Sequence, residues 1–261
     1  MTHQRGPNYR VGLHFARRTA RYALSRLSHL SYGYPMADVV LVHGAASTAA
    51  VWNRVVTALH PLSVLAPDRP GTGDLAAETD WLESISEGAV VFGTSGGATL
   101  VLELAARRHS QQGSSEQRSS EQRSSEQRSA ARALIAHEPA VGSHSPEVFG
   151  PLAAALEASG VNGFGSTLYG PRWTPAPGLT LEQVQRDLAM FRSFEPAPPQ
   201  HPHVVVTTGE YSPPLRHQIA GRLSGLGYAL RTLPGASHFA AAQAPKQVAA
   251  LIRETLVSVG K

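Results

Sequence analysis

The chain of 261 residues contains no cysteine, only two lysines and no long apolar run. The lack of cysteine excludes disulfide bonds, thiolate metal sites and a cysteine nucleophile. No apolar stretch approaches the roughly 18 residues that a membrane-spanning helix needs, so we predict no span. A hydrophobic content of 42% is typical of a globular protein with one buried core, and we expect a cytoplasmic location.

Charge is unevenly distributed along the chain, whose formal net charge is +4. Residues 1–37 hold six of the 23 basic residues and none of the 19 acidic ones, which leaves 17 basic against 19 acidic side chains in the rest. A chain that binds phosphate backbones would carry its basic surplus on the folded body. We therefore expect no nucleic-acid partner and a small-molecule substrate instead.

Residues 1–36 form a separate segment with the pattern of a basic amphipathic helix. Arginines separate apolar residues that recur at helical spacing: Leu13, Ala16, Ala20, Leu24 and Leu27. The richness in arginine and lack of acids resemble an organelle transit peptide. The alternative is a non-native upstream extension, with translation starting at Met36. The lack of an uninterrupted apolar region argues against a secretory signal.

From residue 37 to residue 261, apolar runs rich in β-branched residues alternate with helical patterns. We predict strands at 38–42, 62–67, 89–93, 133–137, 203–208 and 228–233. Nearly continuous apolar strands separated by helices indicate a parallel sheet that is covered on both faces. The predicted fold is an α/β domain with a doubly wound, mostly parallel sheet of about six strands.

Two segments interrupt this alternation. Within 110–130 the sequence SSEQR occurs three times, and its period and polarity predict a disordered insert after a helix at 97–109. Residues 139–200 are too long for a simple crossover and predict a small helical cap. A capping box at Thr180–Gln183 begins one of its helices. Four of that helix's apolar residues are expected to be buried: Leu181, Val184, Leu188 and Phe191.

The first candidate catalytic residue is Ser95, in the G-x-S-x-G motif at residues 93–97. The motif alone is weakly specific, but here it follows a predicted strand and opens a predicted helix. Such a sharp turn between strand and helix exposes the serine hydroxyl at a helix N-terminus, where peptide dipoles favour negative charge. The alternative is a tight turn whose serine has no chemical role.

A second motif, His43-Gly44-Ala45, ends the first predicted strand. Acyl transfer needs two donors for the developing oxyanion, and we predict the N–H groups of Ala45 and Gly96. In a doubly wound sheet the chain reverses between the first and third strands, so their carboxyl ends face one ligand site. His43 itself is expected to be structural.

The candidate general base is His238, which lies in a short loop after the last predicted strand. A serine hydroxyl is a poor nucleophile at neutral pH unless an imidazole takes its proton. Of the twelve histidines, His238 alone lies in a short glycine-containing loop after that strand. His201 and His203 form an H-x-H pair, but no third ligand follows at a useful spacing, so we expect no metal site.

Together these residues resemble the α/β-hydrolase superfamily. Four features occur in the superfamily's order: the His43-Gly44 turn, the segment 68–73 (DRPGTG), Ser95 and the late His238. The resemblance covers residues 37–259 without the repeat insert. It implies the superfamily's fold without its first two strands, a catalytic triad, and no cofactor.

The sequence leaves more than one candidate for the acid of such a triad. The resemblance places it at residue 212, which is a serine here. Glu210 lies in the same loop and is our first candidate, and Glu138, after the fourth predicted strand, is the alternative. A dyad without an acid, or an acid from the cap such as Asp187, stays open.

The expected function is a serine hydrolase that cleaves a small or medium ester, thioester or amide through an acyl-enzyme. Two alternatives stay open. One is a binding protein with this fold and little catalysis, which the missing acid at residue 212 and the shortened sheet favour. The other is cofactor-free perhydrolase or lyase chemistry with the same residues.

Overall fold

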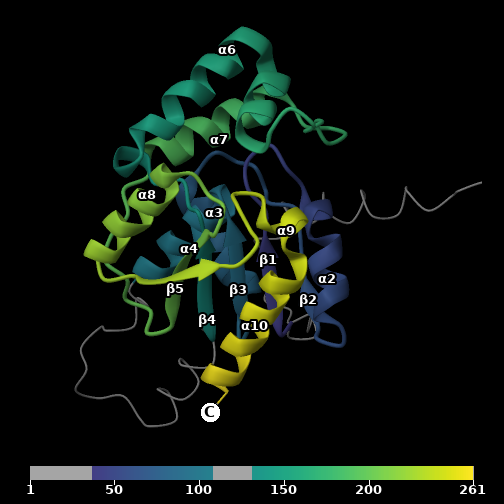
Figure 1. The fold of residues 1–261 in the computed structure, drawn as a ribbon, viewed down its shortest axis with the longest axis vertical. Coiled ribbons are helices and arrows are strands. Elements are labelled where there is room, and N and C mark those ends of the chain that lie inside the picture. The colour runs from purple at the N-terminus through teal and green to yellow at the C-terminus, as the bar shows by residue number, and fades with distance from the viewer. Residues whose placement is uncertain (1–36, 108–130, 261) are drawn as a thin grey trace, which may run out of the picture. The chain divides into compact units, whose positions relative to one another are not determined.

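The computed structural model describes residues 37–107 and 131–260 (Figure 1). The predicted leader at 1–36 and the predicted repeat insert at 110–130 lie outside the described residues. Six parallel strands form one sheet in the order β2-β1-β3-β4-β5-β6. Their bounds are β1 Val39–Val42, β2 Val64–Leu65, β3 Val90–Thr94, β4 Ala133–His137, β5 Val204–Gly209 and β6 Ala229–Leu233. The predicted doubly wound parallel sheet is confirmed.

Each predicted strand lies where the apolar runs indicated, although β2 is much shorter than the predicted 62–67. Only Val64 and Leu65 pair with β1. Pro67 has no N–H to donate to a strand ladder, so the chain leaves the sheet edge just before it. The loop that follows carries the segment 68–73 toward the carboxyl ends of the strands.

Helices cover both faces of the sheet (Figure 1). One face is covered by α3 (Leu75–Ile85), α4 (Gly96–Ala106) and α8 (Pro214–Gly225). The other is covered by α2 (Asn53–Leu59), α9 (Ala240–Gln243) and α10 (Pro245–Val259), with the short η2 (Ala49–Trp52) before α2. In the part of the chain that is described, no helix is long and apolar enough to cross a membrane.

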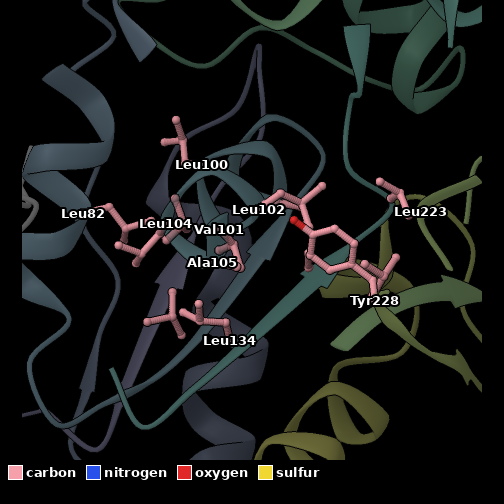
Figure 2. Packing of buried hydrophobic residues seen from close by; sticks show 14 of the residues in the cluster. Leu82, Leu100, Val101, Leu102, Leu104, Ala105, Leu134, Leu223 and Tyr228 are labelled. Carbon is pink, nitrogen blue, oxygen red and sulfur yellow. The ribbon is translucent and has the colours of Figure 1, made fainter. Parts of the chain in front are cut away.

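Side chains of the strands alternate between two apolar cores, as the period of a strand requires. In β1, Val40 and Val42 join the core under α4, whereas Val39 and Leu41 join the core under α10. Figure 2 shows the first of these cores, where Leu102 of α4 and Tyr228 lie among other buried residues. These two cores hold the strand ends that carry the candidate residues.

Two longer helices, α6 (Pro146–Tyr169) and α7 (Leu181–Ser193), follow the short η3 (Gly142–His144) and lie beyond the carboxyl ends of the strands (Figure 1). The predicted capping box is present: the Gln183 N–H donates to Thr180 Oγ1 at 3.2 Å, and the Thr180 N–H donates to Gln183 Oε1 at 2.9 Å. Burial of Leu181 was predicted wrongly, since it is 44% exposed in a first turn that faces solvent. We refer to α6 and α7 as the cap helices.

A buried arginine ties the cap helices to the sheet. Arg69, in the loop after β2, makes ion pairs of 2.6 Å with Glu78 of α3 and 2.5 Å with Asp187 of α7. Its guanidinium also lies 5.3 Å from the centroid of the Phe191 ring. A buried charge is tolerated only when it is paired, so this network holds α7 in one position over the strand ends.

The close contact between α4 and β1 gives a test of the fold. A Cβ atom on Gly97 would lie 2.3 Å from the carbonyl oxygen of Val42. We expect Gly97→Ala to lower the free energy of unfolding by about 1–3 kcal/mol, as overpacking does. In the control, Gly221→Ala in α8, the new Cβ meets no atom within 4 Å. This control should raise stability by about 0.5–1 kcal/mol. Equal effects in urea denaturation would contradict the packing.

Candidate active site

Ser95 occupies the turn between β3 and α4 in a strained backbone conformation. Its φ of 53° and ψ of −121° lie outside the regions that non-glycine residues normally adopt. The turn is possible because its neighbours lack side chains. A Cβ on Gly93 would lie 2.4 Å from the carbonyl oxygen of Gly97, and one on Gly96 would lie 2.3 Å from the Phe191 ring. Strain of this kind persists where the surrounding structure enforces it, and it is concentrated at functional sites.

The end of β1 lies directly against Ser95, as the sheet topology predicted. A Cβ on Gly44 would be only 2.8 Å from Ser95 Cβ. Among the described residues, the N–H of Ala45 has no hydrogen-bond partner. The N–H of Gly96 belongs to the first turn of α4, where no intrahelical acceptor exists. Within the described part of the chain, the N–H groups of both predicted oxyanion donors therefore have no protein acceptor.

His238 pairs with Glu138, the alternative acid, through a hydrogen bond of 3.0 Å between Nδ1 and Oε2. Glu138 directly follows β4, is only 2% exposed, and has a φ of 47°. Its other oxygen, Oε1, accepts the Gly209 N–H at 3.0 Å and the hydroxyl of Ser212. Both carboxylate oxygens of Glu138 therefore accept hydrogen bonds, and these bonds fix the orientation of the side chain.

Glu210, the first candidate for the acid, does not contact His238. Its side chain is exposed and accepts the Gly235 N–H at 2.8 Å. The Glu210 N–H extends the pairing with β6 by donating to the carbonyl oxygen of Leu233, which directs the side chain to the turn that follows β6. The structure therefore corrects the expected pairing of Glu210 with His238, and Ser212, at the superfamily's acid position, holds Glu138 instead.

His137, which the sequence analysis did not single out, joins the serine turn to the histidine loop. Its carbonyl oxygen accepts the Ser95 N–H at 2.9 Å. Its imidazole Nε2 lies 3.0 Å from the carbonyl oxygen of Ser237, and its Nδ1 lies 3.0 Å from Thr207 Oγ1. One buried residue therefore positions both Ser95 and the loop of His238. Its only signal in the sequence is its place at the end of an apolar strand.

Burial and neighbouring charges set the protonation of the pair. Burial would raise the pKa of Glu138, but the hydrogen bond and charge of His238 lower this pKa well below its usual range. Burial and the nearby Arg216 guanidinium lower the pKa of His238 to about 4, against the upward influence of Glu138. At neutral pH the imidazole is therefore uncharged, with Nδ1–H donated to Glu138 and a lone pair on Nε2.

The Nε2 atom of His238 is buried and has no hydrogen-bond partner within the described part of the chain, Ser95 Oγ included. Tyr169, the last residue of α6, covers this imidazole with its ring, at a centroid distance of 6.0 Å and an interplanar angle of 21°. The Tyr169 hydroxyl donates to the carbonyl oxygen of Ala45 at 2.6 Å. The cap therefore closes directly over the histidine and the end of β1.

A small cavity lies between Ser95 and the cap helices. Most of its walls are apolar side chains of α6 and α7: Phe149, Leu152, Phe164, Leu168, Leu188 and Phe191. The polar side chains that reach it are those of Ser95 and Arg216. An apolar cavity with few polar groups is the common form of a small-molecule site.

Two other titratable residues near the strand ends, His43 and Asp187, have structural partners. His43 accepts the Arg69 N–H at 3.0 Å through Nε2, and burial lowers its pKa to about 4, as expected of a structural histidine. Asp187 forms an ion pair with Arg69 that connects α7 to the loop after β2. In residues 37–107 and 131–260, no group of three acidic or histidine side chains has the arrangement of a metal site.

Comparison with known proteins agrees with the fold. Among solved structures, the enol-lactonase from Burkholderia xenovorans LB400 has a TM-score of 0.62 at 17% identity, over 87% of this chain and 94% of that chain. The carboxylesterase CesB from Bacillus subtilis has a TM-score of 0.55 at 18% identity, over 87% and 85%. The type II thioesterase BorB of the borrelidin cluster has a TM-score of 0.53 at 19% identity, over 86% and 93%.

Comparison with curated protein sequences gave no match. The profile of the Alpha/beta hydrolase family matches residues 39–251, which is most of the chain and includes the serine turn and the histidine loop. The chain belongs to the alpha/beta hydrolase family.

Proposed function

We propose that this protein is a serine hydrolase that cleaves a small or medium ester, thioester or amide through an acyl-enzyme. The observation that carries the proposal is the buried Glu138–His238 hydrogen bond beside the strained turn of Ser95. His137 is hydrogen bonded to both segments, which keeps the hydroxyl and the imidazole on one strand edge. That edge is where ligands of parallel α/β sheets bind.

In the proposed mechanism, Ser95 Oγ attacks the carbonyl carbon while His238 Nε2 takes its proton. Glu138 holds the imidazole in the tautomer with Nδ1–H and stabilises the imidazolium that forms. The N–H groups of Ala45 and Gly96 bind the oxyanion. The imidazolium then protonates the leaving group, and water releases the acyl group in a second cycle of the same steps.

The cavity and the proteins of similar fold bear on the choice among acyl substrates. The apolar walls of the cavity suit an apolar acyl or alcohol group. Proteins of similar fold include a carboxylesterase, a thioesterase and an enol-lactonase. The alternative of a binding protein without catalysis is favoured by the missing acid at residue 212 and by the shortened sheet. Glu138 contacts His238 from the neighbouring strand, which answers the first of these two arguments.

A fluorophosphonate probe tests the nucleophile, because it forms a covalent bond with an activated serine. We expect the probe to label the wild-type protein and the Ser84→Ala control in α3, but not Ser95→Ala. Loss of the hydroxyl should also lower kcat/KM for nitrophenyl esters by at least about 10⁴-fold. Labelling that survives in Ser95→Ala, or no labelling of the wild type, counts against the proposal.

Separate substitutions of the two glutamates identify the acid. Because Glu138 holds the imidazole, Glu138→Gln should lower kcat by about 10⁴-fold, as loss of a triad acid does. Glu210→Gln should leave kcat within a few-fold, since Glu210 contacts only the turn after β6. Steady-state kinetics with a nitrophenyl ester measure both.

A variant that moves the carboxylate from residue 138 to residue 212 serves as the positive control for this experiment. Ser212 Oγ already contacts Glu138 Oε1, so an aspartate at residue 212 would place a carboxylate in the same pocket. Ser212→Asp in the Glu138→Gln background should recover at least about tenfold of the lost kcat, because the acid is restored. A kcat that stays near the wild-type value in Glu138→Gln but falls strongly in Glu210→Gln would show that Glu210 is the acid and would refute the assignment.

A further inference from the structure

Arg216 is a second charged group at the candidate site, and the proposed mechanism does not use it. It lies in the first turn of α8, and its side chain is 11% exposed. It reaches the same cavity as Ser95, whose other walls are almost entirely apolar. A cation in such a place loses hydration and must recover that cost from a partner.

Glu138 is a poor partner for this guanidinium. The contact between Arg216 Nε and Glu138 Oε2 is 3.5 Å long and uses only one of the three nitrogens. Glu138 already receives hydrogen bonds from Gly209, Ser212 and His238, so it needs no further donor. The two terminal nitrogens of Arg216 donate to no acceptor within the described residues. The planar end of the guanidinium is therefore available to a ligand.

The position of Arg216 also acts against the proposed general base while the cavity holds no anion. Its positive charge favours the neutral form of His238 and lowers the pKa of that imidazole. An anion beside Arg216 would offset this positive charge and so favour protonation of His238 when it accepts the serine proton.

We propose that Arg216 binds a carboxylate of the substrate, so that the hydrolase acts on esters or thioesters that carry a second, free carboxyl group. This inference rests on the proposed function of Ser95. A carboxylate matches the planar guanidinium through two parallel hydrogen bonds. Among the described residues that line the cavity, Arg216 is the only cation, so it balances a carboxylate in full but leaves one charge of a phosphate dianion unpaired. The apolar wall of the cap helices then contacts the carbon chain between the carboxylate and the reacting carbonyl.

Calorimetry on the Ser95→Ala variant separates binding from turnover. The probes are the monomethyl esters of succinate, glutarate and adipate, compared with methyl valerate as a neutral ester. We expect at least one monoester to bind more tightly than methyl valerate. Adding Arg216→Gln should weaken that binding by about 10–100-fold, the usual effect of losing hydrogen bonds to a charged group. Binding of methyl valerate should change far less.

Two further variants make the result specific. Arg222→Gln, on the same helix, removes an exposed arginine that contacts Glu147 and the carbonyl oxygen of His144, and it should leave monoester binding unchanged. Arg216→Lys keeps the positive charge but lacks the planar guanidinium. Its affinity for the monoester should therefore lie between those of the protein with Arg216 and of Arg216→Gln. Equal binding of neutral and anionic esters, an equal loss in Arg222→Gln, or tighter binding of inorganic phosphate than of every monoester would overturn the proposal.

Turnover by the protein with Ser95 intact distinguishes the two proposals. The ratio of kcat/KM for nitrophenyl hydrogen glutarate to that for nitrophenyl valerate should fall by about tenfold or more in Arg216→Gln. Binding that depends on Arg216, together with no turnover of any ester, would refute the hydrolase function and leave the carboxylate site. Turnover with an unchanged ratio would refute the carboxylate site and leave the hydrolase.

Discussion

The hydrogen bond between Glu138 and His238 is the interaction on which the rest of the site depends. It joins the loop after β4 to the loop after β6, and the loop after β5 supports it through Gly209 and Ser212. Because the three strands are parallel neighbours, their carboxyl ends meet at one edge of the sheet. A buried carboxylate is stable there only because every oxygen is engaged.

This arrangement explains why the proposed acid can follow β4 even though residue 212 is a serine. Glu138 has a positive φ, which turns its side chain from the end of β4 toward the loop of β5. Ser212 then contributes a hydroxyl donor at the position where the resemblance predicts the acid. The carboxylate that contacts His238 Nδ1 comes from the end of the neighbouring strand instead.

Much of the site was predictable because its signals are local. Apolar runs defined the six strands, and the small residues around Ser95 defined a turn that side chains would block. The partner of His238 was not predictable in this way. Whether Glu210 or Glu138 reaches the imidazole depends on the register of β4, β5 and β6 and on one unusual backbone angle. Neither leaves a pattern in the sequence, which therefore favours Glu210, the residue nearer to the expected position in the loop.

The charged residues around the cap were also beyond local patterns. Arg69 belongs to the segment that resembles the superfamily, yet its role as a buried link from α3 to α7 requires Asp187, which lies far along the chain. The sequence around Arg216 predicts only an ordinary surface helix. Only the packing of α8 against the strand ends brings its guanidinium to the cavity of Ser95. Tertiary contacts thus decide which charges are structural and which are free for a ligand.

Proton NMR of the Nδ1–H of His238 tests the central claim most directly, because a hydrogen bond to a buried carboxylate shifts this proton far downfield. A His238→Ala variant assigns the signal and separates it from those of the other buried histidines. The account predicts that the signal persists in Glu210→Gln and is lost or moves strongly upfield in Glu138→Gln. A signal that persists in Glu138→Gln and disappears in Glu210→Gln would contradict it.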